Sequence, residues 1–139
     1  ILKKELTLIP IFGWYLKKIG SISIKRNKIS KDNLDFFGNI SEKLLKTERP
    51  LIIFPQGTRV LPDERPPFKK GVSRIYEELK IKCQPVAINS GYVWPKRGNK
   101  NNKRKITISI LKPIHTGISK DEFLKNLENN IYAELDLLR

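Results

Sequence analysis

Residues 51–59 join a short apolar run to a polar turn and read Leu51-Ile52-Ile53-Phe54-Pro55-Gln56-Gly57-Thr58-Arg59. The apolar run is long enough for a buried strand and too short for a helix, and Pro55 and Gly57 end regular structure directly after it. Gly57 permits a positive φ and a close approach of the backbone to a ligand. Arg59 offers a planar guanidinium that can hold a phosphate through two parallel hydrogen bonds. The residues alone are consistent with two interpretations: a strand, a turn and a surface arginine, or an anion-binding loop at the end of a strand.

Two segments before this run predict an α/β unit. Residues 20–26 alternate apolar and polar side chains, as a half-buried strand does, and residues 33–46 carry apolar side chains at helical spacing. Strand, helix and strand in this order form a parallel unit with a right-handed crossover, and ligands collect at the carboxyl ends of its strands. Arg26 and Arg59 both stand at such an end. If the two strands are neighbours, two guanidinium groups face one pocket.

The rest of the chain continues the alternation of strands and helices. A Pro-containing loop at residues 60–70 leads into an amphipathic helix, residues 84–89 and 106–110 are expected strands, and residues 121–138 are an expected helix. The apolar stripes of the two helices are Val72, Ile75, Tyr76 and Leu79, and Leu124, Leu127, Ile131, Leu135 and Leu138. We therefore predict a single α/β domain over residues 1–139, with a mixed, largely parallel sheet flanked by helices.

The turn sequence Phe54-Pro55-Gln56-Gly57-Thr58-Arg59 resembles the Phe-Pro-Glu-Gly-Thr-Arg signature of the glycerolipid acyltransferases. Within that family it is most similar to the 1-acylglycerol-3-phosphate (lysophosphatidic acid) acyltransferases. Other segments from Leu6 to Pro113 resemble the family too: the strand ending at Arg26, Phe68-Lys69-Lys70-Gly71, and the strand that begins at Pro85-Val86. Gln56 departs from the family pattern, because it keeps the size and hydrogen bonding of glutamate but loses the charge.

The resemblance implies a glycerol-3-phosphate acyltransferase-like fold and a set of site residues. It implies that the substrate phosphate is bound by Arg26, Gly57, Thr58, Arg59 and Lys69, supported by the motif residues Phe54, Pro55, Gln56, Gly71 and Pro85. The implied reaction moves a fatty acyl group from acyl-CoA or acyl carrier protein to the free hydroxyl of lysophosphatidic acid. Its product is phosphatidic acid, for phospholipid biosynthesis, and it needs no cofactor or metal. The implied location is the cytoplasmic face of a membrane, peripheral or anchored by a segment outside this chain.

The catalytic base of the family is a His followed, after four residues, by an Asp. The chain has one histidine, His115, and the position five residues on is Lys120, with Asp121 one further. We therefore expect His115 to be a loop histidine without a catalytic role. The chain begins at Ile1, and we expect the catalytic motif upstream of it, so that the domain as given is N-terminally incomplete.

The charge of the chain favours anionic partners. Lys and Arg number 28 against 14 Asp and Glu, a formal net charge of +14, which suits nucleic acid, anionic lipid or an acidic protein. The densest basic run, residues 96–105, is either a solvated loop or a contact for anionic lipid or acyl carrier protein. The run lacks interleaved aromatic residues for base stacking, which argues against nucleic acid. A non-catalytic basic module that binds nucleic acid or an anionic membrane is the alternative function.

Two further sequence features bear on function. Cys83 is the single cysteine, which excludes an internal disulfide, and one Cys with one His does not make a structural zinc site.

Residues 6–16 are apolar and aromatic between flanking lysines. They are either a core-facing helix or an interfacial segment with Trp14 and Tyr15 at the level of lipid headgroups. No stretch approaches the roughly 20 apolar residues of a membrane span.

Overall fold

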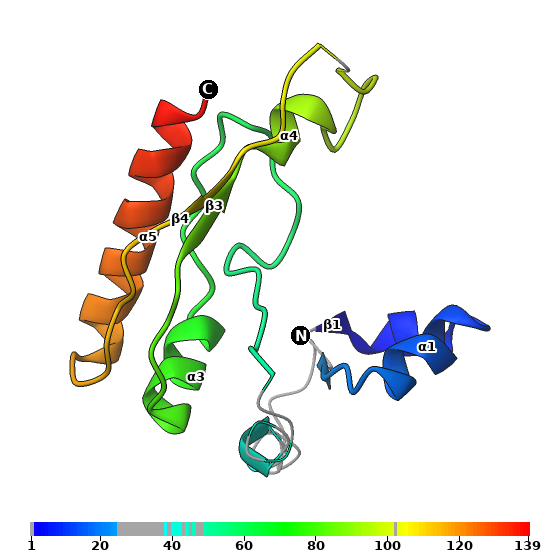
Figure 1. Cartoon of the computed structure of the whole chain (residues 1–139), viewed down its shortest axis with the longest axis vertical. Helices are drawn as coiled ribbons and strands as arrows, with labels where there is room; N and C mark the ends of the chain where they lie inside the picture. The colour runs from blue at the N-terminus through cyan, green and yellow to red at the C-terminus, as the bar shows by residue number, and fades with distance from the viewer. Residues whose placement is uncertain are drawn as a thin grey trace. The chain divides into compact units, whose positions relative to one another are not determined.

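The computed structural model describes residues 2–24, 38, 40–42, 44, 46, 49–101 and 103–139. The chain divides into two compact units, Ile1–Phe54 and Pro55–Arg139, shown in blue to cyan and in green to red in Figure 1. Arg26 and most of the expected helix at residues 33–46 lie outside the described residues. The described part of that helix, residues 38, 40–42, 44 and 46, is helical, and Ile40 is fully buried, as the apolar spacing predicts.

The first unit begins with a short helical hairpin. Its elements are β1 (Leu2–Lys3), the 3-10 helix η1 (Lys4–Leu8), α1 (Phe12–Lys18) and β2 (Ser23–Ile24), and β1 pairs with β2 in parallel. A Cβ atom at Gly13 would lie 2.1 Å from the carbonyl oxygen of Thr7, so only glycine lets α1 pack this closely on η1. Gly13 and Leu16 are the buried residues of α1.

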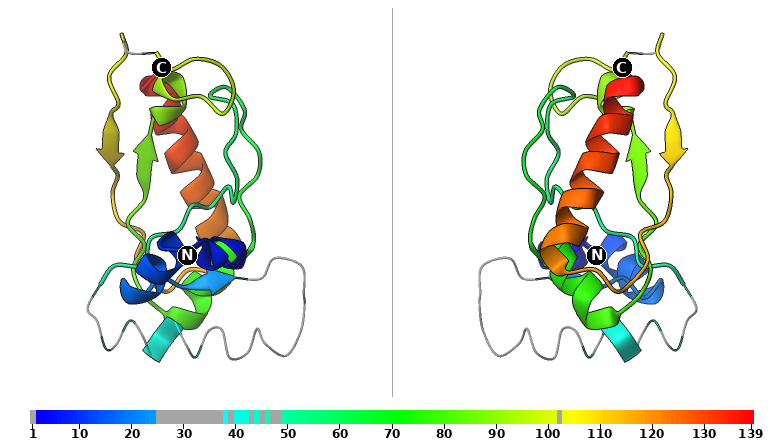
Figure 2. Two further views of the ribbon diagram at one scale, coloured as in Figure 1. Left: turned by 90° about the vertical axis from the view of Figure 1, so that its right-hand side faces the viewer. Right: turned by 90° about the vertical axis from the view of Figure 1, so that its left-hand side faces the viewer.

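The second unit places one long helix against a small antiparallel sheet. Its elements are α3 (Gly71–Leu79), β3 (Val86–Ile88), α4 (Ser90–Val93), β4 (Ile108–Ile110) and α5 (Lys120–Leu137). β3 pairs with β4, with Ala87 opposite Ser109, and α5 runs alongside the pair (Figures 1 and 2). Ala87 is 1% exposed, and the Ser109 hydroxyl donates to Glu134 of α5 at 2.6 Å. One face of the sheet therefore packs on α5.

The core of the second unit lies between α3 and α5. The Tyr76 and Phe123 rings stack with centroids 3.8 Å apart and planes within 6°. Leu127 and Ile131 extend the buried stripe of α5. The helix begins where Ser119 accepts a hydrogen bond from the Glu122 backbone N–H at 3.2 Å, an N-cap that satisfies an otherwise unpaired donor.

The structure confirms the two helices predicted after residue 70. α3 buries Val72, Ile75 and Tyr76, as predicted. In α5 the buried stripe starts at Phe123, whereas the apolar spacing predicted that it starts at Leu124. The stripe is shifted because the Phe123 ring stacks on Tyr76 and draws that side of the helix into the core.

The predicted largely parallel sheet is not what the described residues form. Their strands make a parallel pair of two-residue strands in the first unit and an antiparallel pair in the second. Residues 51–54, expected as a buried strand, have no regular structure, and Ile52 and Phe54 are 65% and 74% exposed. An apolar run becomes a strand only where a neighbouring strand pairs with it, so the run alone was an insufficient signal.

Among the described residues, no helix has the length and apolar character needed to cross a bilayer.

Candidate functional site

The turn at residues 55–58 brings the backbone close to Lys69. Gly57 has φ of +70°, which is the left-handed region that favours glycine. A Cβ atom at Gly57 would lie 3.2 Å from Cγ of Lys69. The aliphatic part of the Lys69 side chain therefore contacts Gly57. A residue with a side chain at position 57 would disturb this contact.

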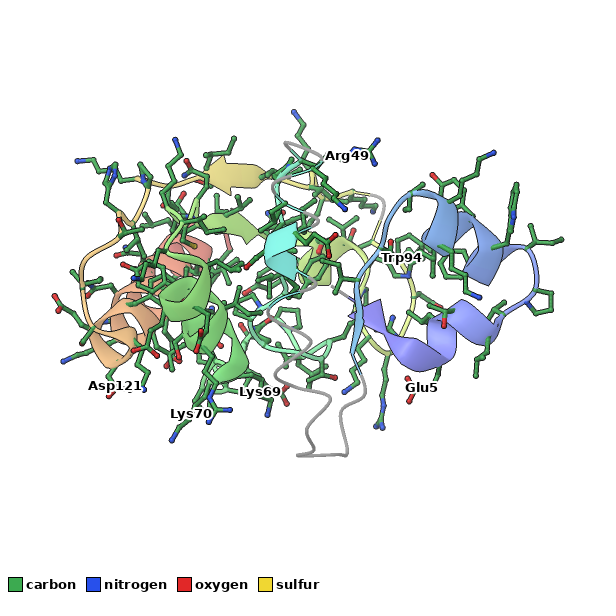
Figure 3. All side chains as sticks on the ribbon, turned by 90° about the horizontal axis from the view of Figure 1, so that it is seen from below. Glu5, Arg49, Lys69, Lys70, Trp94 and Asp121 are labelled. Carbon is green, nitrogen blue, oxygen red and sulfur yellow. The ribbon has the colours of Figure 1, made fainter. Side chains whose placement is uncertain are left out.

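A backbone hydrogen bond joins the two loop segments that the sequence analysis singled out. The Lys69 N–H donates to the Pro55 carbonyl at 2.9 Å. Thr58, Arg59 and Lys69 are all exposed, so their polar ends are available to a ligand in solvent. The Lys69 and Lys70 side chains lie near one end of α3 (Figure 3). α3 begins at Gly71, and the positive end of its dipole adds to the charge of the lysines.

Tyr132 of α5 is hydrogen-bonded both to the turn and to the loop that follows it. Its hydroxyl donates to the Pro66 carbonyl and accepts a long hydrogen bond, 3.4 Å, from Nε2 of Gln56. Its ring packs on buried Phe68 with centroids 5.0 Å apart and planes inclined by 60°. One tyrosine thus holds the turn, the loop after it and the residue that precedes Lys69.

Two carboxylates of α5 hold the same loop on either side of Tyr132. Glu128 accepts the backbone N–H of Phe68 at 2.8 Å. Asp136 accepts from the Arg65 guanidinium at 2.6 Å, and that guanidinium lies 5.4 Å from the centroid of the Tyr132 ring. The loop at residues 60–70 has no regular structure of its own, and α5 supplies much of what fixes it.

Local environment shifts the pKa values of Tyr132 and Asp136. Burial raises the pKa of Tyr132 and the Glu128 charge adds to the effect, against the opposing hydrogen bond from Gln56 and the charge of Arg65. The hydrogen bond from Arg65 lowers the pKa of Asp136. Tyr132 is therefore a neutral hydrogen-bonding group and Asp136 an ionised one near neutral pH.

The structure brings together part of the predicted site. Gly57 and Lys69 are in contact, Pro55 bonds to Lys69, and Thr58 and Arg59 continue the same turn. Gly71 starts α3, whereas Pro85 is buried directly before β3, where its carbonyl accepts from the Leu111 N–H at 3.1 Å. Phe54 is exposed, and Arg26, the second predicted arginine, lies outside the described residues.

The residues of α5 that hold the loop were not predicted from the sequence. Glu128, Tyr132 and Asp136 follow one another at intervals of four, so they lie on one face of the helix. A polar stripe on a helix whose opposite face is apolar indicated that the polar face has a partner. The sequence did not identify the loop at residues 60–70 as that partner.

His115 and Cys83 take no part in this arrangement. His115 is exposed in a loop, as expected, and its carbonyl accepts from the Tyr76 hydroxyl at 2.7 Å. Burial raises the pKa of the Cys83 thiol, which leaves it a weak nucleophile. Within the part of the chain that the structure describes, no cluster of three or more His, Cys, Asp or Glu side chains could hold a metal ion.

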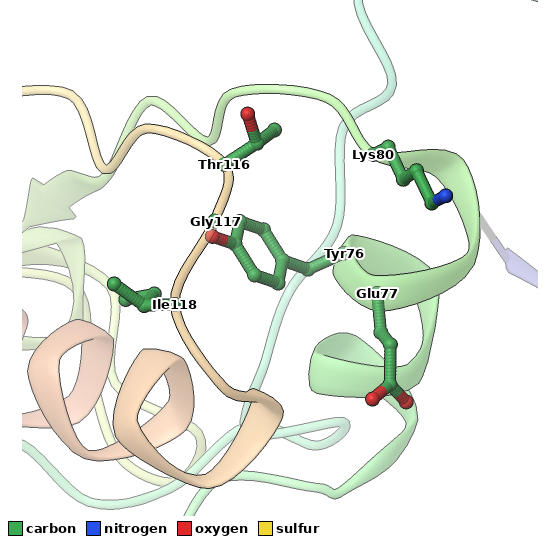
Figure 4. A pocket seen from close by; sticks show the side chains of 6 residues that line it. All are labelled: Tyr76, Glu77, Lys80, Thr116, Gly117 and Ile118. Atoms are coloured by element: carbon green, nitrogen blue, oxygen red, sulfur yellow. The ribbon is translucent and has the colours of Figure 1, made fainter.

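A surface pocket of about 360 Å³ lies between the end of α3 and the loop that precedes α5 (Figure 4). It is lined by Tyr76, Glu77, Lys80, Thr116, Gly117 and Ile118. Its two charged groups have opposite signs, and Glu77 also pairs with Lys120 at 3.5 Å. The pocket contains none of the residues predicted to bind phosphate.

The basic run at residues 96–105 packs against two aromatic rings that precede it. Nζ of Lys100 lies 4.0 Å from the centroid of the Trp94 ring, and the Arg104 guanidinium lies 5.1 Å from that of Tyr92. Such pairs hold a cation over a ring face. The described residues of the run, 96–101 and 103–105, are exposed and form a loop, as expected, but their aromatic partners were not anticipated from the sequence.

Comparison with known proteins identifies the family. Residues 1–89 match the sequence profile described as acyltransferase, which covers the turn, the Lys69 loop, α3 and β3. The chain belongs to the acyltransferase family.

Several named acyltransferases are similar to this one. It is 35% identical to a 1-acyl-sn-glycerol-3-phosphate acyltransferase of Saccharomyces cerevisiae, with 86% of this chain and 41% of the relative covered. It is 33% identical to proteins of the same name from Helicobacter pylori, with 96% and 56% covered, and Pseudomonas aeruginosa, with 70% and 38% covered. The chain thus spans about half the length of these relatives, or less. No solved structure matches this acyltransferase chain.

Proposed function

We propose that the protein containing this chain acylates the free hydroxyl of 1-acylglycerol-3-phosphate and so makes phosphatidic acid. The names of the relatives support this substrate, because the similar proteins from yeast and bacteria are called 1-acyl-sn-glycerol-3-phosphate acyltransferases. The acyl donor in this proposal is a thioester, either acyl-CoA or acyl carrier protein. The two units together form one acyltransferase domain in this proposal.

The observation that carries the proposal is the contact between the Gly57 turn and the Lys69 loop. It brings the Lys69 side chain against a glycine at positive φ, and the exposed residues Thr58 and Arg59 follow that glycine directly in the chain. In our proposal Arg59 binds the substrate phosphate through parallel hydrogen bonds, Thr58 donates one more, and Lys69 adds a point charge. Arg26 supplies the second guanidinium.

We propose that the base for the hydroxyl proton lies outside residues 1–139. The histidine of this chain, His115, is exposed, and its backbone carbonyl is bonded to Tyr76 in a loop remote in sequence from the turn. General-base catalysis needs a group within hydrogen-bond reach of the proton that it removes. Residues 1–139 alone should therefore bind the lysolipid with little turnover, and robust acyl transfer by this chain alone would contradict the assignment of the base.

The proposed location is the cytoplasmic face of a membrane, where the lysolipid substrate and the phosphatidic acid product both reside. Attachment is peripheral or through a segment outside this chain.

The test compares the affinity of the chain for a short-chain 1-acylglycerol-3-phosphate with that for the matching monoacylglycerol, which lacks the phosphate. Arg59→Gln and Lys69→Gln should each weaken binding of the phosphate form by roughly tenfold, the effect of losing a charge-assisted hydrogen bond. Binding of the monoacylglycerol should not change. Isothermal titration below the micelle concentration measures both.

Arg97→Gln is the matched control, because it removes the same charge from the exposed basic run. It should leave the affinity for the phosphate form unchanged. Equal weakening by Arg97→Gln and Arg59→Gln would indicate a general electrostatic effect and would reject the turn as the phosphate site.

The alternative function, a non-catalytic basic module for nucleic acid or anionic membranes, has less support. The faces of Trp94 and Tyr92 nearest the basic run are covered by cations of this chain, which removes them as platforms for bases. Tight, sequence-tolerant binding of single-stranded nucleic acid, with no preference for the phosphate-bearing lysolipid, would favour the alternative.

A further inference from the structure

The hairpin of the first unit exposes an unusual amount of apolar surface. Its end, which we call the apolar tip, consists of Leu8, Ile9, Ile11, Phe12, Trp14 and Tyr15. Ile11 is 84% exposed, Leu8 76% and Trp14 64%. Single exposed apolar residues are ordinary on protein surfaces, but a contiguous group marks a surface that contacts something else.

The apolar tip is held in place by the hairpin beneath it. The Gly13 N–H donates to the Ile9 carbonyl at 2.7 Å, and Gly13 packs directly on Thr7. Ile11 has φ of +65° and ψ of −57°, and the Phe12 N–H donates to the Pro10 carbonyl at 2.6 Å, which is a strained γ-turn and costs most for a β-branched residue. A fixed backbone thus presents large apolar side chains to solvent in a turn that its central residue does not favour.

The charges around the apolar tip are positive. Lys17 and Lys18 end α1, and Nζ of Lys18 lies 4.9 Å from the Trp14 ring centroid. The sequence has no acidic residue between Glu5 and Asp32. Apolar and aromatic side chains bordered by lysines match an anionic lipid surface, because rings favour the headgroup region and lysines favour its phosphates.

We propose that the apolar tip inserts into the interfacial region of an anionic phospholipid membrane. A second copy of the chain is a poorer occupant of this surface, because two molecules with a net charge of +14 repel each other. The proposal does not rest on the proposed reaction or on the phosphate site. Its test measures lipid binding alone, so either proposal can fail while the other stands.

The first experiment follows the environment of Trp14 in the whole chain. The chain has two tryptophans, so Trp94→Phe leaves Trp14 as the reporter, and Trp14→Phe leaves Trp94 as the control. Vesicles of phosphatidylcholine with phosphatidylglycerol should shift Trp14 emission to the blue and protect it from a water-soluble quencher. Vesicles of phosphatidylcholine alone should give a smaller effect, since the lysines then lack anionic lipid.

The second experiment removes an apolar side chain without straining the fold. Ile11→Asn removes a β-branched side chain from a strained turn, so the thermal midpoint should stay the same or rise. Binding to the anionic vesicles should fall by roughly tenfold, the effect of one apolar side chain no longer buried in lipid. Ile110→Asn is the matched control, because Ile110 is 72% exposed on β4, which belongs to the second unit.

Three outcomes would overturn the proposal. The first is Trp14 emission that does not respond to anionic vesicles. The second is Trp14 already shielded from the quencher in lipid-free monomer, which would mean that the rest of the chain covers the apolar tip. The third is a concentration-dependent dimer that Ile11→Asn abolishes, which would make a second copy the occupant.

Discussion

Gly57 is the residue on which the shape of the turn depends. Its φ of +70° and the nearby Cγ of Lys69 both oppose a side chain at this position. Gly57→Ala should lower the free energy of unfolding by roughly 1–2 kcal/mol, the cost of the left-handed conformation for an L-residue. Urea unfolding of the purified chain measures it.

Gly71 offers the control for this prediction. It starts α3, and nothing lies within 4 Å of where its Cβ atom would be. Gly71→Ala should raise the free energy of unfolding by about 0.5–1 kcal/mol, because alanine loses less backbone entropy in a helix. Equal destabilisation by both substitutions would show that the turn has no special need for glycine.

The side-chain amide of Gln56 supplies the hydrogen-bond donor that the Tyr132 hydroxyl can accept. The Tyr132 hydroxyl has one proton, which it donates to Pro66, so the group opposite it must donate, and Gln56 does. Gln56→Glu would place a second acceptor there and should destabilise the chain near neutral pH by up to about 1 kcal/mol.

The loss of stability in Gln56→Glu should depend on pH. Protonation of the introduced carboxylate restores the donor, so the folded state raises the pKa of that carboxyl group above its unfolded value. The destabilisation should be complete above the folded pKa and disappear as pH falls below about 4.3, the ordinary glutamate value. Urea midpoints of both proteins across this range test it, and a difference independent of pH would contradict the hydrogen-bond explanation.

At this scale the sequence predicted the turn and not its support. The residues around Gly57 predicted the turn because that signal is local, and the resemblance to the acyltransferase family implied that Lys69 shares an anion site with it. Gln56 and Tyr132 are 76 positions apart, and Phe68 and Glu128 are 60 apart. Contacts over such separations follow from tertiary packing, which periodicity within one helix does not specify.

Among the elements, α5 has the largest structural role in the second unit. It bonds to the sheet through Ser109 and Glu134 and to the loop through Glu128, Tyr132 and Asp136. Ser119→Ala removes its N-cap and should lower the free energy of unfolding by about 1 kcal/mol. Ser119→Asp, which keeps a capping oxygen, should restore the stability, as thermal or urea unfolding would show.

The ion pair between Arg65 and Asp136 predicts a pH effect. The pKa of Asp136 is lowered by Arg65, so the pair stabilises the chain above the ordinary aspartate pKa and stops doing so as pH falls through the lowered value. Asp136→Asn should therefore reduce stability near neutral pH and have little effect in strong acid. The reduction should be small, because the Asp136 side chain is 53% exposed and solvent screens the pair.

A comparison of urea midpoints at neutral and acidic pH checks this prediction. A deficit of the same size at both would show that Asp136 acts through something other than its charge.

The elements that the sequence predicted well are those whose signal is contained within one segment. α3 and α5 appear where apolar spacing places them, and β3 and β4 lie within the expected strands. The strand expected at residues 51–54 is not formed among the described residues, since a strand is defined by its pairing as well as by its side chains. Periodicity indicates which face is buried, and it does not name the partner.

At the scale of the whole molecule, the net charge of +14 predicts non-specific binding to nucleic acid at low salt. The affinity should fall steeply and linearly on a log–log plot as salt rises, with no preference among duplex sequences. Replacing Lys100 and Arg104 together by Gln should reduce that slope by about 2 if the basic run makes the phosphate contacts. Filter binding over a salt series measures both the slope and any preference.

A defined preference for one duplex, or affinity that persists at high salt, would revive the nucleic-acid alternative.

The position of α5 also affects how the protein can be shortened. The match to the acyltransferase profile ends at residue 89. The helix that fixes the loop at residues 60–70, α5, spans Lys120–Leu137. A polypeptide trimmed to the matched region would keep every motif residue and lose Glu128, Tyr132 and Asp136 together. Motif boundaries are thus a poor guide for cloning here, because the loop at residues 60–70 depends for its shape on α5, which lies beyond the end of the profile match.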